Sequence, residues 1–236
     1  MVRTIGVGLL WIGFISYAFL LAPPTQPDTF ELIKNLSTGQ LENINPLIIA
    51  LFNLMGILPL IYGCVLFIDG RGQKIPAWPF AIGTFALGGF VLLPYLALRE
   101  SNPKFTGEKG WFLKLQDSRL FGILITLGAL ILLSVGIVNI FNGNWADFVE
   151  QWQTSRFIHV MSLDFCVLCL VFPALLKDDM ARRGVKNSLV FWGVSLIPLL
   201  GALAYLCLRP SLPDNIYSDS QSDKVANLNI LGNKQY

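Results

Sequence analysis

The chain has 236 residues, of which 54% are hydrophobic and only 14% are charged, and its formal net charge is +2. Soluble domains carry about 25% charged residues, so this composition excludes an ordinary water-soluble domain. The small net charge supports neither a nucleic-acid partner nor an acidic tail. We therefore expect the lipid bilayer to be the main partner of this chain.

Six stretches are long and apolar enough for transmembrane helices, which need roughly 20 residues each. Backbone polar groups in a bilayer must be satisfied within the segment, which favours helices, and the alternation of a membrane barrel is absent. The sequence therefore predicts an all-α polytopic helical bundle over residues 1–209. Its six spans are expected at about residues 4–22, 47–68, 79–98, 120–139, 157–176 and 188–208.

The first stretch has some features of a secretory signal peptide, because Arg3 precedes an apolar run that ends near Ala22. The run is longer than a usual signal core, and Pro23 and Pro24 lie where cleavage would occur. We expect a first helix that is retained.

Two connecting segments have the pattern of short interfacial helices. Residues 30–36 repeat their apolar positions at helical spacing, and Trp145, Phe148 and Trp152 share one side of another short helix. Aromatic rings of this kind prefer the headgroup level of a membrane. The segment that follows the last predicted span, residues 210–236, is polar and is expected to form a flexible tail.

The distribution of Lys and Arg gives a prediction of orientation. With six spans, ten of these residues fall in the first, third and fifth loops, and seven fall on the other side, two of them far along the tail. Five against ten places both termini on the non-cytoplasmic side by the positive-inside rule.

A candidate internal repeat has an offset of 110 residues. Residues 95–99 read Tyr-Leu-Ala-Leu-Arg, residues 205–209 read Tyr-Leu-Cys-Leu-Arg, and the same offset carries Asp69 onto Asp179. With three helices per half, the two halves would have opposite topology, a 3+3 inverted repeat of the kind that secondary transporters use. A chance match in apolar sequence is the plainer alternative.

Asp164 is the one carboxylate well inside a predicted span. An ionised group there is costly unless it is paired or hydrated, so it should face the bundle interior or a polar cavity. It could contact a proton, a ligand or a pigment. It could equally be a polar clasp between helices, or a carboxyl kept neutral by burial.

His159, the only histidine, lies five residues earlier on the same helix. Five residues turn a helix well past one full turn, so His159 and Asp164 do not share a face and make poor joint metal ligands. His159 could bind a chlorophyll or haem axially, but we favour a histidine satisfied at the membrane surface. Asn53 and Tyr95 are further polar groups available to a central site.

Cys166 and Cys169 form a CxxC pair on one helix face, close enough for redox chemistry. Their apolar surroundings and the lack of a loop cysteine favour a structural role. No phosphate-binding loop, HExxH motif or nucleophile–base pair is found. The sequence predicts no metal site and favours a protein that is not an enzyme.

Several motifs resemble a family of uncharacterised membrane proteins of cyanobacteria and chloroplasts. They are residues 156–165, residues 52–56 with Pro59, residues 75–80 and residues 93–99. More distantly, the last two helices are similar to the plastid membrane family needed for neoxanthin formation. The shared features there are a His and an Asp in one helix, an acid- and arginine-rich loop, and a final Pro-containing helix that ends in Tyr205-Leu-Cys-Leu-Arg209.

The resemblance implies a photosynthetic membrane, either a thylakoid or a plasma membrane, with a carotenoid or chlorophyll as candidate cofactor. We therefore expect an accessory or assembly protein that binds a lipophilic ligand or a photosynthetic membrane complex. A small secondary transporter and a membrane enzyme acting on a carotenoid or quinone are the alternatives.

Overall fold

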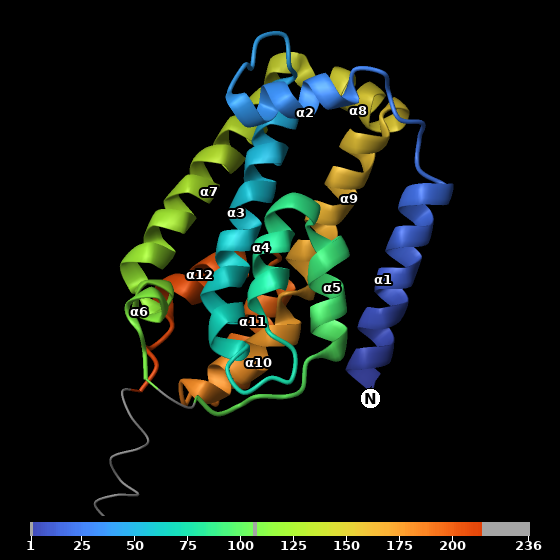
Figure 1. The fold of residues 1–236 in the computed structure, drawn as a ribbon. Helices are drawn as coiled ribbons and strands as arrows, with labels where there is room; N and C mark the ends of the chain where they lie inside the picture. Colours follow the sequence, from blue (N-terminus) through green and yellow to red (C-terminus); the bar gives the residue numbers. More distant parts are fainter. Residues whose placement is uncertain (1, 106–107, 214–236) are drawn as a thin grey trace, which may run out of the picture.

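The computed structural model describes residues 2–105 and 108–213, and every regular element in these two ranges is a helix. The predicted all-α fold is therefore confirmed (Figure 1). Most of the predicted polar tail, residues 214–236, lies outside the described residues.

The helices follow one another along the chain with short connections. In order they are α1 (Val2–Leu20), α2 (Thr29–Thr38), α3 (Pro46–Asp69), α4 (Trp78–Leu87), α5 (Gly89–Leu98), α6 (Trp111–Asp117), α7 (Arg119–Asn139), η1 (Ile140–Asn144), α8 (Trp145–Thr154), α9 (Arg156–Val171), α10 (Pro173–Arg182), α11 (Ser188–Leu196) and α12 (Leu200–Leu208).

Four continuous helical stretches in the described residues are long and apolar enough to cross a membrane. They contain α1, α3, α7 and the nearly continuous pair α9–α10. The apolar part of the stretch Arg119–Thr154 is only 17% buried, so large apolar side chains cover the outer surface of the bundle. Water would penalise such a surface, whereas lipid tails match it.

The prediction of six spans is not confirmed, because two of the predicted spans are each a hairpin of two short helices. Residues 79–98 break at Gly88 (φ 51°, ψ −130°) into α4 and α5, each of 10 residues. Residues 188–208 break similarly into α11 and α12. At 1.5 Å per residue such a helix covers about 15 Å, half of a hydrocarbon core of roughly 30 Å. Each hairpin therefore enters and leaves at the same end of the bundle (Figure 1).

The predicted inverted repeat is not confirmed either, since the two halves run in the same direction. At one end of the bundle Arg182, which closes α10, contacts Asp69, which closes α3. Near the other end Ile48 of α3 packs with Ile158 and Met161 of α9. The long helices of the two halves are thus parallel.

The offset of 110 residues nevertheless carries one structural unit onto the other. It places the first residue of α3, Pro46, on the first residue of α9, Arg156, and it places α4 on α11 and α5 on α12. Each unit is a long helix followed by a helical hairpin that turns back halfway. We name these the first unit (46–98) and the second unit (156–208).

The central core lies where the two units meet. Fully buried apolar side chains from both hairpins and both long helices pack together there, including Leu66, Leu92, Leu175 and Leu203. Outside this core, α7 packs on α3 and α12, whereas α1 packs on α5. The short helices α2 and α8 lie across the end opposite the hairpin openings (Figure 1).

Because two predicted spans are hairpins, the Lys and Arg residues are distributed over the two ends of the bundle differently from the six-span prediction. In the described residues, only Lys34 and Arg156 lie at the end with α2 and α8. The opposite end carries thirteen: Arg3, Arg71, Lys74, Arg99, Lys104, Lys109, Lys114, Arg119, Lys177, Arg182, Arg183, Lys186 and Arg209. The count of five against ten Lys and Arg residues assumed six spans. With hairpins in place of two spans, that count no longer supports termini on the non-cytoplasmic side.

Candidate functional site

The tip of the first hairpin is held by Asp164 of α9. The backbone N–H of Gly89, at the start of α5, donates to Asp164 Oδ1 over 2.9 Å. A Cβ atom on Gly88 would lie 1.8 Å from Asp164 Oδ2, and the positive φ of Gly88 also disfavours any other residue. Two consecutive glycines therefore let the carboxyl group reach the N-terminus of α5, whose dipole favours a negative charge.

Beside this tip lies a pocket of about 310 Å³, which we call the Asp164 pocket. Its walls come from α1, α3, the α4–α5 tip and α9, and they are mostly apolar, with Phe52 and Met161 among them. Asp164, Thr84 and Arg156 are its polar members. A volume of this size, apolar walls and a few polar groups are typical of small-molecule sites.

The polar groups of the Asp164 pocket are well separated along α9. Arg156 begins this helix, and its Nε donates to the carbonyl of Pro23 over 2.9 Å. Asp164 lies eight residues further on, which is about 12 Å along a helix. The pocket can thus accept an elongated apolar molecule, with one polar group near the bundle end and another at the hairpin tip.

His159 lies away from the Asp164 pocket. Its ring is buried, with Nε2 2.8 Å from the Tyr17 hydroxyl and Nδ1 2.9 Å from the carbonyl oxygen of Trp152. The ring also stacks on Trp152 at a centroid distance of 4.2 Å. Both ring nitrogens are hydrogen-bonded, so His159 joins α1, α8 and α9.

The remaining predicted site residues also lie outside the Asp164 pocket, and Cys166 lines a separate pocket of about 640 Å³ together with His159. Asn53 is exposed on α3, and its side chain donates to the carbonyl of Ile49. Cys166 is exposed and Cys169 is buried, and neither is part of a disulfide. Of the predicted set, Asp164 alone lines the Asp164 pocket.

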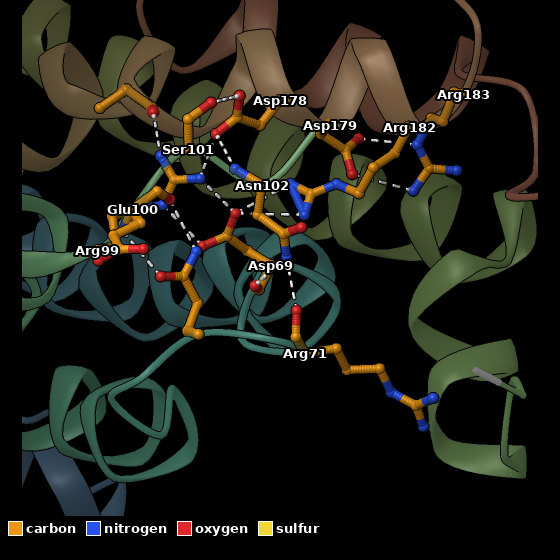
Figure 2. Close-up of polar contacts among 12 residues, drawn as sticks. Asp69, Arg71, Arg99, Glu100, Ser101, Asn102, Asp178, Asp179, Arg182 and Arg183 are labelled. Atoms are coloured by element: carbon orange, nitrogen blue, oxygen red, sulfur yellow. Dashed lines mark hydrogen bonds and ion pairs between the residues drawn. The ribbon is translucent and has the colours of Figure 1, made fainter. Parts of the chain in front are cut away.

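Tyr95 belongs to a different feature, a buried ionic network at the hairpin-opening end of the bundle. Figure 2 shows the part of this network around Asp69, Arg99 and Asp178. The Tyr95 hydroxyl donates to Asp69 Oδ2 over 2.8 Å, and Arg99 Nε donates to the same oxygen over 2.7 Å. Arg99 also pairs with Asp178, and Arg182 Nη2 lies 3.1 Å from Asp69 Oδ1. Asp69 therefore ties the end of α3 to both the first hairpin and the second unit.

The second unit repeats this arrangement. The Tyr205 hydroxyl donates to Asp179 Oδ2 over 2.7 Å, and Arg209 Nη1 lies 3.4 Å from the same oxygen. Arg183 joins Asp179 over 2.8 Å and Asp117 over 2.5 Å. The triads Asp–Tyr–Arg in the two units therefore occupy the positions that the 110-residue offset relates.

Burial disfavours the charged form of Arg99 and Arg183, but their carboxylate partners favour this form more strongly. Hydrogen bonds and charge interactions with Asp69 and then Asp178 raise the pKa of Arg99 above its ordinary value despite burial. Asp179 and then Asp117 likewise raise the pKa of Arg183. A network in which each carboxylate is hydrogen-bonded to arginine is a structural clamp between the units, with its charges occupied by one another.

Sequence reasoning found the members of the repeat but did not recognise them as a network. The signal was present, because Asp69, Tyr95, Arg99 and their counterparts share the offset. What the sequence does not show is that residues 26 and 30 positions apart meet, which requires the hairpin.

No protein-family model matches the chain, and neither the curated proteins nor the solved structures give a significant match. The class of protein therefore follows from the fold and the apolar outer surface. It is a multi-helix membrane protein that contains two parallel units.

Proposed function

We propose that this protein binds a lipophilic molecule in the Asp164 pocket. The observation that carries the proposal is a carboxyl group fixed at a hairpin tip, facing an apolar pocket between membrane-length helices. One oxygen of Asp164 is held by Gly89, which leaves the carboxyl group oriented for a hydroxyl or amine donor from a ligand. Arg156, at the other end, suits a carbonyl or an anionic group.

The resemblance to cyanobacterial and chloroplast membrane proteins supports a photosynthetic membrane as the setting. An isoprenoid pigment or quinone has the required chemistry, an elongated apolar body with polar groups at its ends. We therefore propose an accessory role in pigment or quinone handling in a thylakoid or plasma membrane. The transporter alternative drew on an inverted repeat, whereas the two units are parallel, an arrangement that also occurs in transporters.

The pocket is tested by purifying the protein in mild detergent and analysing bound small molecules by solvent extraction and mass spectrometry. Ala86 is exposed and lines the pocket, so Ala86→Trp fills it at little cost to folding. We expect a stoichiometric lipophilic compound in the wild-type extract and at least tenfold less in Ala86→Trp. Asn53→Ala, outside the pocket, is the matched control and should retain the compound.

The role of Asp164 is tested by titrating a dihydroxy carotenoid and an isoprenoid benzoquinone into the depleted protein. Asp164→Asn keeps an acceptor for Gly89 but removes the charge. A hydrogen bond to a charged group contributes about 1.5–3 kcal/mol, so the dissociation constant should rise roughly ten- to a hundredfold. Equal affinities of wild type and Asp164→Asn, or an extract that matches bulk lipid in both wild type and Ala86→Trp, would contradict the proposal.

We also propose that the end of the bundle with thirteen Lys and Arg residues faces the cytoplasm, together with the N-terminus of α1 and the end of α12. The positive-inside rule supports this orientation, since the opposite end has two such residues. In a background with the native cysteines replaced, Lys34→Cys should react with a membrane-impermeant maleimide in intact cells. Lys104→Cys, equally exposed, should react only after permeabilisation. The reverse pattern would show the opposite orientation.

A further inference from the structure

The 110-residue offset relates one wall of the Asp164 pocket to one wall of a second pocket. A second pocket, of about 300 Å³, lies between α3, α7, α8 and α9, and we call it the Leu54 pocket. Its four α3 residues are Leu47, Ala50, Leu51 and Leu54, and the offset of 110 places them on Phe157, Val160, Met161 and Asp164 of the Asp164 pocket. The correspondence continues in the other long helix, where Phe165 takes the place of Met55.

The chemistry of the two pockets differs at one decisive position. The only carboxylate in the lining of the Asp164 pocket is replaced by Leu54 in its counterpart, and no lining residue of the Leu54 pocket is ionisable. The Leu54 pocket has no counterpart of the hairpin tip, because no residue of α11 or α12 lines it. A ligand in the Leu54 pocket would therefore find hydrocarbon contacts along its whole depth.

The α8 residues in the lining of the Leu54 pocket indicate at which end such a ligand would enter. Trp145 and Phe148 of α8 line the pocket at the bundle end, and their rings stack on each other at a centroid distance of 5.6 Å. Aromatic rings at this level mark the boundary between headgroups and lipid tails. A chain that passes these rings goes from the headgroup region into the space between α3 and α7.

We propose that the Leu54 pocket binds an acyl chain of a membrane lipid, with the lipid headgroup outside at the level of Trp145. The duplicated fold thus has one pocket for a ligand with a polar end and one for plain hydrocarbon. The inference rests on the proposed function only in that it treats the Asp164 pocket as a binding site. A fixed lipid between α3 and α7 would fill space that these helices leave open.

The experiment uses the full-length protein in vesicles that contain a phosphatidylcholine with a photoreactive diazirine near the end of one acyl chain. After illumination, mass spectrometry of peptides locates the crosslinks. We expect them at Leu51 and Leu54, inside the pocket. Gly136→Trp should reduce these crosslinks at least tenfold, whereas Ala86→Trp in the other pocket should leave them unchanged.

A Cβ atom on Gly136 would lie 3.9 Å from the nearest atom, the Cβ of Ala50, so the smaller change Gly136→Leu serves if the tryptophan variant does not fold. Crosslinks confined to outward-facing residues such as Ile131, or unchanged by both Gly136 variants, would show annular lipid only and overturn the inference. If crosslinks appear in the Leu54 pocket while Ala86→Trp retains the extracted compound, the proposed function fails and this inference stands. If Ala86→Trp loses the compound but no crosslinks appear in the Leu54 pocket, this inference alone is rejected.

Discussion

Replacing Asp69 by asparagine is expected to lower the free energy of unfolding by about 3–5 kcal/mol, the usual effect of breaking a buried ion pair. Asp69 is fully buried and receives hydrogen bonds from Tyr95, Arg99 and Arg182. Without its charge, the guanidinium groups of Arg99 and Arg182 remain in a low-dielectric site with too little compensation. Equilibrium unfolding in mixed micelles measures the loss.

The repeat gives this experiment an internal replicate and a control. Asp179→Asn, at the equivalent position in the second unit, should cause a loss of similar size, because Asp179 likewise has one tyrosine and two arginines as partners, Tyr205, Arg183 and Arg209. Lys74 and Glu100 form an exposed pair at the same end of the bundle, and such pairs contribute little. Lys74→Gln should therefore be indistinguishable from wild type. If Asp69→Asn behaved like Lys74→Gln, the network would not be a clamp.

Gly88→Ala is expected to destabilise the first hairpin and abolish binding in the Asp164 pocket. The backbone conformation of Gly88 is unfavourable for other residues, which costs on the order of 1–3 kcal/mol. In addition, the new methyl group would overlap Asp164 Oδ2 and push the carboxyl group away from Gly89. Thermal denaturation and ligand extraction report the two effects separately.

A double-mutant cycle separates backbone strain from the clash. In an Asp164→Ala background the overlapping carboxyl group is gone, so Gly88→Ala should cost less than in wild type. The matched control is Gly56→Ala in α3, where a Cβ atom meets nothing within 4 Å and alanine favours the helix. Additive effects of Gly88→Ala and Asp164→Ala would mean that the two residues do not touch.

Part of the candidate site was accessible from the sequence. Asp164 is conspicuous because a lone carboxylate in an apolar stretch needs a reason. Its partner was not predictable, since Gly89 is 75 positions away and donates a backbone N–H that any residue possesses. In the structure the Asp164 carboxyl group forms a polar clasp between helices, because it accepts a hydrogen bond from Gly89 of α5. The same group also lines the Asp164 pocket, so it is in place to contact a ligand.

The sequence by itself determined the helical membrane class, the positions of the apolar stretches and the offset of 110 residues, because these depend on local hydropathy and on residue identity along the chain. Only the tertiary structure decided that residues 79–98 and 188–208 fold back as hairpins. The physical reason is that two half-length helices and one full-length helix need the same apolar composition, and Gly88 and Pro198 are tolerated in both. That choice then decides which end collects the arginines, which direction the second unit runs, and which carboxylates the arginines meet.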